Sequence, residues 1–241
     1  GPGRMVSELN YVNKLQKENS NFRKFLNNRE FIISVHQSQQ YDAAKLFVSP
    51  VSKKSYEKLG NNLRKIYPDA EIKKITKEDA IILEFHLPQN PEYSFYISHY
   101  NDLFLMSFSE ILMQRSLRTL KSTASLASNK DFIEMSKLTG KTGHRLFINY
   151  QYLPEIIYKY INPETGVENF LKNFASVTGL EIAVKNNEIQ LDGYTSAKES
   201  NKYLNIFRKQ KPGKTNIPSL LPQSASSFVI VNIGKGKEFK K

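Results

Sequence analysis

The residues best suited to acid–base or metal chemistry at neutral pH are four histidines, His36, His86, His99 and His144. All four fall in or beside predicted strands, and His86 and His99 could face each other across a turn at 88–91. A metal site needs a third ligand at a recognisable spacing, and neither that ligand nor an H-E-x-x-H motif is present. We therefore interpret the histidines as half-exposed strand residues, and no Gly-x-Ser-x-Gly elbow supports nucleophilic catalysis.

Two carboxylates that line one cleft would suit glycoside hydrolysis, and the strand residues Glu84, Glu181 and Asp192 are the candidates. Side chains alternate between the two faces of a strand, so Asp192 points away from its neighbour Leu191. A solvated strand face produces the same pattern. We predict that these acids have no catalytic role, that the protein is not an enzyme, and that it binds no cofactor or metal.

The string Gly140-Lys141-Thr142-Gly143 has the residue types with which phosphate loops hold phosphates. A Walker A loop also needs a glycine five residues earlier, where this chain has Met135, and it must open a helix. This string instead precedes a predicted strand. A similar Gly-Lys-Thr at 213–215 fails in the same way, so both are predicted to be ordinary turns.

Tyrosine and phenylalanine are abundant, with 13 and 15 residues, and several of them gather near Tyr150 and Tyr152. Exposed tyrosines are typical of partner-binding surfaces, although strands favour tyrosine in any case. Unpaired strand edges recruit other strands. We therefore predict a partner surface at the strand edges that carry His36 and Tyr150, with Tyr152 beside the latter.

The net charge of +12 is distributed unevenly along the chain. Residues 208–241 contain eight basic residues and one acidic residue, whereas both signs are interspersed in the rest. An alternative function is therefore binding of an acidic polymer or nucleic acid through this basic segment. Aromatic residues that would stack on bases are not interleaved with the basic ones, so nucleic acid is the less favoured partner. The candidate contacts are Lys235, Lys237, Lys240 and Lys241.

The overall composition is that of an ordinary globular protein, with 39% hydrophobic and 24% charged residues. Because the chain has no cysteine, disulfides and thiolate chemistry are excluded. The longest apolar runs fall far short of the ~20 residues that a membrane helix needs. Residues before Met5 look like the remnant of a cleaved expression tag.

Hydrophobic periodicity predicts an α+β protein in which repeated antiparallel meander sheets have helices packed on one face. Two hairpins, with turns at Asn101-Asp102 and Asn186-Asn187, are each followed by a predicted helix. Similar apolar strands open each predicted unit. Helices are expected at 7–28, 52–66, 109–121, 152–160, 163–174 and after Ser196, and strands at 31–36, 44–48, 71–75, 81–86, 93–100, 103–108, 146–150, 180–185, 188–194 and 228–232.

The expected organisation follows the Ser- and Ala-rich stretch at 122–129 and the Lys-Pro-Gly at 211–213, both of which suit linkers. Residues 1–5 are assigned to the tag. Residues 6–121 form a first α+β unit with N-terminal helices, and 122–211 form a second. Residues 212–241 form a linker and the start of a truncated third unit, so the chain is expected to be a fragment of a longer one.

The chain resembles an uncharacterised bacterial family of extracytoplasmic, duplicated α+β domains of unknown function. The similarity lies in the segment from Asn27 to Val48, in YSFYISHY-ND-LFLMSF followed by a helix, and in LPQSASSFVIVN. The resemblance implies a protein exposed at the cell envelope, in the periplasm or at the cell surface, often anchored near its N-terminus. It implies no enzyme activity. Our leading hypothesis is a non-catalytic interaction or scaffolding module whose partners are other envelope proteins.

Overall fold

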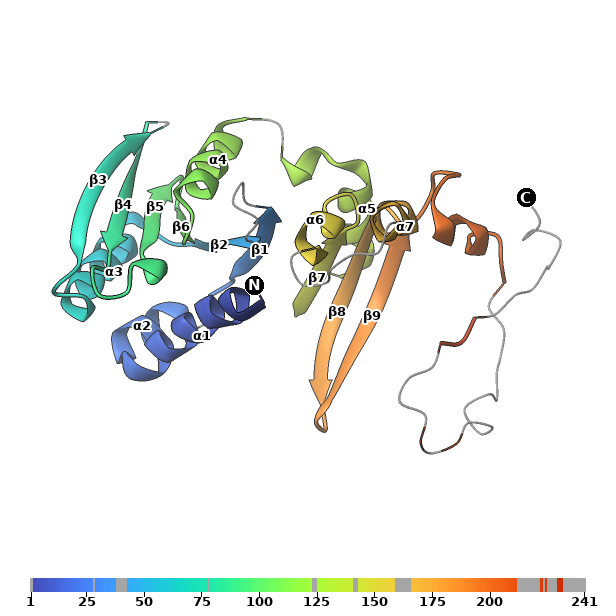
Figure 1. The fold of residues 1–241 in the computed structure, drawn as a ribbon, viewed down its shortest axis with the longest axis horizontal. Helices are drawn as coiled ribbons and strands as arrows, with labels where there is room; N and C mark the ends of the chain where they lie inside the picture. Colours follow the sequence, from blue (N-terminus) through green and yellow to red (C-terminus); the bar gives the residue numbers. More distant parts are fainter. Residues whose placement is uncertain are drawn as a thin grey trace. The chain divides into compact units, whose positions relative to one another are not determined.

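The chain forms two compact units, which we describe separately. The first comprises residues 1–128 together with 155–162, and the second comprises 129–154 together with 163–241. Figure 1 follows the chain by colour from the N-terminus to the C-terminus. The computed structural model describes residues 2–27, 29–37, 43–77, 79–122, 125–140, 143–158, 166–211, 222, 224 and 229–231.

The first unit is built on a six-stranded antiparallel sheet in the order β1-β2-β6-β5-β4-β3. Strands β3 to β6 form a meander, and β6 returns to pair with β2, so that Leu46 lies opposite Ser107. β1 and β3 are therefore the edges of the sheet. The strands are β1 (Ile32–Gln37), β2 (Ala43–Pro50), β3 (Glu71–Lys77), β4 (Ala80–His86), β5 (Phe95–Tyr100) and β6 (Leu103–Ser107).

Two tight turns form where the sequence predicts them. Asn101 and Asp102, between β5 and β6, have φ angles of 48° and 56°. Asn186 and Asn187, in the second unit, have φ angles of 51° and 63°. Two successive residues with positive φ define the type I′ turn, whose twist matches that of the strands it joins. Asparagine and aspartate tolerate this conformation better than other non-glycine residues.

Helices pack on both faces of the six-stranded sheet. Leu15, Phe22, Phe25, Leu59 and Leu63 come from the helices on one face and are buried against the aromatic side of the sheet, where Phe85 and Phe95 stack at 4.9 Å. On the other face, helical Leu112, Met113 and Leu117 pack on Leu46, Ile82 and Leu105. The helices are α1 (Pro2–Glu18), α2 (Ser20–Leu26), α3 (Lys53–Ile66) and α4 (Glu110–Lys121), and a 3-10 turn, η1, spans Pro91–Tyr93.

The predicted α+β class with antiparallel, meander-like sheets is confirmed. The first unit departs from the expected placement of helices on one face. Its central strands are apolar on both sides, as Leu46 and Phe47 or Leu105 and Met106 show. Because adjacent residues point to opposite faces, each side of such a strand needs its own helical cover.

The second unit has a three-stranded antiparallel sheet in the order β7-β8-β9. α5 packs on one face of this sheet, where Phe132 contacts Phe147 at 5.0 Å and Thr139 lies against Gly179. The elements are η2 (Leu126–Ser128), α5 (Lys130–Leu138), β7 (His144–Asn149), α6 (Leu153–Ile157), α7 (Val167–Phe174), β8 (Val177–Lys185), β9 (Glu188–Ser196) and η3 (Tyr203–Phe207).

The predicted helix after Ser196 is wrong. The chain there makes a bend and then the short 3-10 helix η3 at Tyr203–Phe207. Ser196 is also unavailable as a helix cap, because its hydroxyl donates to Asp131 of α5. Of the predicted strand at 228–232, only 229–231 are described, and they have no regular secondary structure. Within the described residues, no helix combines the length and apolar character needed to cross a bilayer.

Candidate interaction site

Strand β1 forms an open edge of the six-stranded sheet. Among the described strands it pairs only with β2, with Ile33 opposite Phe47 and Val35 opposite Lys45. Ile32, Ile33 and Val35 are large apolar residues that remain exposed. β1 has no formally charged side chain at neutral pH. An edge with free backbone groups and uncharged apolar side chains is a template for another strand.

The opposite edge of the same sheet is different in character. β3 pairs only with β4 among the described strands and carries Lys73, Lys74 and Lys77, all exposed. Lysines on an edge strand oppose pairing with a further strand, because their charges would have to lose water. The same sheet therefore has one protected edge and one unprotected edge.

His36, the predicted contact on β1, is exposed, and its Nε2 lies 2.9 Å from the Ser34 hydroxyl on the same side of the strand. Partial loss of solvent lowers the pKa of His36 below its ordinary value of 6.5. The ring is therefore neutral at neutral pH, and it adds no cation to the edge.

The two predicted tyrosine contacts have opposite environments. Tyr150 is 9% exposed, its hydroxyl accepts a hydrogen bond from Thr178, and its ring packs at 5.3 Å from Phe174. Tyr152, two residues later, is 59% exposed. Tyr150 is thus part of the core of the second unit and not of its surface, whereas Tyr152 is accessible. The four predicted polyanion contacts, Lys235, Lys237, Lys240 and Lys241, lie outside the described residues.

The candidate carboxylates are divided between the two units. Glu181 and Asp192 are cross-strand partners in β8 and β9. They line a shallow depression of about 390 Å³ with Leu138, Thr139, Gly193 and Tyr194. Glu84 lies in the first unit, where its carboxylate accepts a 3.1 Å hydrogen bond from Tyr96. The described residues contain no group of three histidine, aspartate or glutamate side chains placed to hold a metal ion.

The other chemical candidates have structural roles. His86 and His99 do not face each other, because His86 lies beside Ser94 and His99 is opposite Phe104. His99 instead stacks on Tyr56 at 5.1 Å, and its Nε2 contacts the Val51 carbonyl at 2.7 Å. Gly140 follows the end of α5 with a φ of +70°, which is the usual conformation of a glycine after a helix. Lys141 and Thr142 lie outside the described residues.

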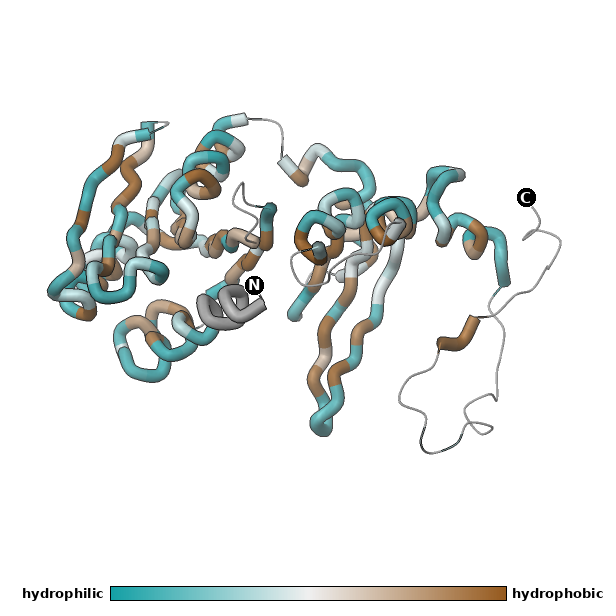
Figure 2. The backbone as a smooth tube through the Cα atoms, in the orientation of Figure 1, coloured by the Kyte–Doolittle hydropathy of each residue, from teal (hydrophilic) through white to brown (hydrophobic). Residues whose placement is uncertain are grey.

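Sequence reasoning missed an apolar sheet face in the second unit. Because Phe147 and Gly179 point toward α5, the residues before and after them point to the other face. The large side chains there are Leu146 (40% exposed), Val184 (69%), Ile189 (71%) and Leu191 (51%). The signal in the sequence is the strict alternation of LEIAVKNNEIQLDG, in which every second residue before and after the turn is apolar or glycine. Figure 2 shows the alternating colours along this hairpin.

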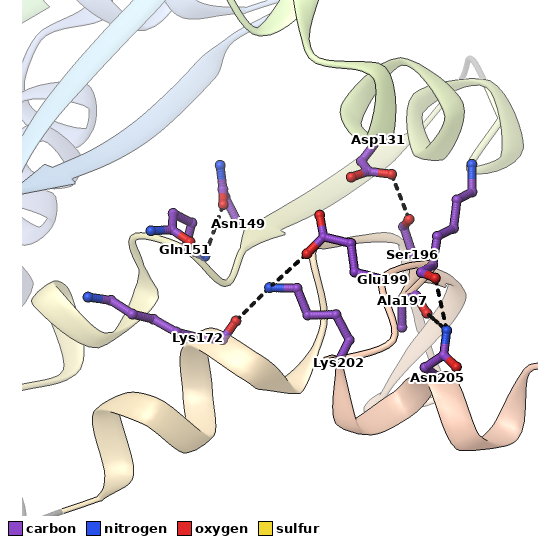
Figure 3. A network of polar contacts seen from close by, with 10 residues as sticks. Asp131, Asn149, Gln151, Lys172, Ser196, Ala197, Glu199, Lys202 and Asn205 are labelled. Carbon is purple, nitrogen blue, oxygen red and sulfur yellow. Dashed lines mark hydrogen bonds and ion pairs between the residues drawn. The ribbon is translucent and has the colours of Figure 1, made fainter. Parts of the chain in front are cut away.

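A polar network fixes the segment that follows β9 (Figure 3). The Lys202 ammonium donates to the carbonyl of Lys172 in the last turn of α7 and lies 3.9 Å from the Glu199 carboxylate. The Asn205 side chain donates to the carbonyls of Ala197 and Lys198. Cations near a helix C-terminus are stabilising because they meet the free carbonyls. The network leads to no cavity and has a structural role.

Comparison of the chain with protein-family models, with curated proteins and with solved structures found no match. The family resemblance, the extracytoplasmic address and the envelope partners therefore stay predictions.

Proposed function

We propose that this protein is a non-catalytic interaction module that binds an extended segment of a partner by adding it as a strand to the edge of β1. The observation that carries the proposal is the difference between the two edges of one sheet. β1 presents exposed Ile32, Ile33 and Val35, whereas β3 presents lysines.

Strand addition combines two sources of affinity. Backbone hydrogen bonds to the free edge give binding that tolerates many sequences, and alternate side chains give specificity. The side chains of Ile33 and Val35 lie on the face of Phe47, while Ile32 lies on the opposite face with Val48. An added strand with apolar residues at alternate positions would extend both surfaces.

The test is selection of extended peptides from a random library on the purified chain, followed by measurement of their dissociation constants. Replacing Ile33 and Val35 with lysine should weaken binding by about tenfold or more, because it gives β1 the character of β3. The matched control is Ile81→Lys, which adds the same charge at an exposed residue of the interior strand β4. That control should leave the dissociation constant unchanged.

The mode of binding is tested by methylating the backbone nitrogens of a selected peptide one at a time. A strand added to β1 points alternate N–H groups at the edge. Methylation should therefore abolish binding at every second position and be tolerated between them. Failure to select any peptide, or equal losses with Ile81→Lys, would show that β1 is not a recognition edge.

A further inference from the structure

The sheet of the second unit has a polar and an apolar face along its outer half. Toward the Asn186-Asn187 turn, the face shared with α5 carries Glu181, Gln190 and Asp192. The opposite face carries Ile182, Val184 and Leu191 together with Ile189. Alternation of this kind is typical of a sheet whose apolar face is covered by another element.

The apolar residues form one continuous surface. The register places Val184 opposite Ile189, Ile182 opposite Leu191 and Leu146 opposite Leu180. Directly opposite side chains on one face are about 5 Å apart, so the three pairs touch in sequence along the sheet. We call Leu146, Leu180, Ile182, Val184, Ile189 and Leu191 the hairpin patch.

Only one end of this face is covered among the described residues. There Tyr150 and Thr178 are buried, and Phe174 of α7 packs on Tyr150. In Figure 1 the outer half of the hairpin extends beyond α5 and α7. Exposure increases in that direction, from 40% at Leu146 to 71% at Ile189. The hairpin patch is thus a shelf that begins at the core of the unit and ends at the turn.

The charge of the hairpin differs from that of the chain. β8, β9 and their turn contain Glu181, Glu188 and Asp192 but only one cation, Lys185. The hairpin is therefore acidic in a chain whose net charge is +12. This acidity favours a partner with basic residues beside its apolar ones, and it disfavours an anionic lipid surface.

The size of the patch limits the kind of partner. Its four most exposed side chains present an apolar area on the order of 400 Å², within the range of functional surface patches. Each partner in a stable complex buries about 800 Å², so packing two such patches together would give too small a dimer interface. One helix, about 10 Å wide, spans two strands that lie about 4.8 Å apart. α5 already packs on the other face of β8 and β9 in this way.

We propose that the hairpin patch binds a basic amphipathic helix of a partner protein. The apolar side of the helix lies along β8 and β9, and its Lys or Arg residues reach the carboxylates of Glu188 and Asp192 at the margin of the hairpin. This surface is distinct from the edge of β1, so either binding activity can fail without the other.

The probe is a synthetic 14-residue peptide of leucine and lysine, with leucine at helical i, i+3, i+4, i+7 spacing. Its dissociation constant for the full chain is measured by fluorescence anisotropy. Ile189→Thr with Leu191→Thr should weaken binding by about tenfold, because threonine keeps strand propensity and removes apolar area. Asp192→Asn should weaken it less, and only at low salt. Gln190→Thr, on the opposite face of the same strand, should have no effect.

A photo-crosslinking amino acid separates this surface from others without relying on affinity. Placed at position 189, it should label the peptide, and placed at position 190 it should not. Equal labelling at both positions, or equal binding of the peptide with glutamate in place of lysine, would overturn the proposal. Tighter binding of the chain to phosphatidylcholine vesicles than to the peptide would also overturn it and assign the patch to lipid.

Discussion

The hydroxyl of Ser196, the last residue of β9, donates a 2.8 Å hydrogen bond to the carboxylate of Asp131 in the first turn of α5. Ser196 is almost fully buried, at 3% exposed. The same residue closes the sheet, because its carbonyl accepts a bond from the Ser176 amide. One short side chain therefore connects the outer strand of the second unit to the helix on its face.

Replacing Ser196 with alanine should destabilise the second unit by about 1–2 kcal/mol, because the Asp131 carboxylate loses a buried donor. The measurement is urea unfolding followed by circular dichroism. The control is Ser52→Ala, since the Ser52 hydroxyl contacts only the exposed Ser55 hydroxyl among the described residues. Its effect should be smaller than about 0.5 kcal/mol. Equal effects of both variants would mean that the Ser196 bond adds no stability.

Gly193 should not tolerate a side chain. A Cβ atom at this position would lie 2.0 Å from the Gly179 carbonyl oxygen, so the two strands would have to separate. We expect Gly193→Ala to cost about 2–3 kcal/mol. Gly60, inside α3, has open space around it, and Gly60→Ala should stabilise the first unit by up to about 1 kcal/mol. Thermal unfolding of the two variants should shift the midpoint in opposite directions.

The second helical cover of the six-stranded sheet can be tested on α4. Leu117 is fully buried, whereas Leu120 in the same helix is largely exposed. Leu117→Ala should cost about 2–5 kcal/mol because it leaves a cavity against the sheet. Leu120→Ala should cost less than about 1 kcal/mol. Guanidinium unfolding measures both, and similar losses would mean that α4 does not pack as described.

Alkaline pH should destabilise the first unit through two tyrosines. Burial raises the pKa of Tyr56 and that of Tyr96 to about 12 each, above the ordinary value of 10.0. The folded chain keeps these protons when the unfolded chain loses them. Stability is therefore constant with respect to these groups below pH 10 and falls between pH 10 and 12. Unfolding free energies measured across that range, with tyrosinate absorbance as a second signal, check the prediction.

Tyr56 and Tyr67 give a matched pair of tyrosine variants for the same pH range. The buried Tyr56 hydroxyl finds no hydrogen-bond partner among the described residues, so Tyr56→Phe should leave stability unchanged or raise it at neutral pH. The Tyr67 hydroxyl accepts a 2.7 Å bond from Tyr11, and Tyr67→Phe should cost about 1 kcal/mol. Tyr56→Phe should also reduce the loss of stability above pH 10. An unchanged alkaline slope would exclude Tyr56 as its source.

Local sequence rules predicted most of the elements and both Asn-led turns. These features depend on residues a few positions apart, as the positive φ angles of Asn101 and Asn186 illustrate. The same rules failed after Ser196, where the residue spacing of a helix cap was present. Its hydroxyl is held by Asp131, a residue far away in the chain, and that contact leaves no side chain to start a helix.

The candidate surfaces were predictable only in part. The chain by itself determined that β1 carries apolar residues and no charge, and that the LEIAVKNNEIQLDG hairpin alternates. Tertiary structure decided which of these residues stay exposed. Tyr150 and Tyr152 have the same signal in the sequence, but Phe174 and Thr178 bury the first and leave the second in solvent. Burial depends on contacts between distant segments, such as the pairing of β2 with β6, and periodicity within one segment carries no information about its neighbours.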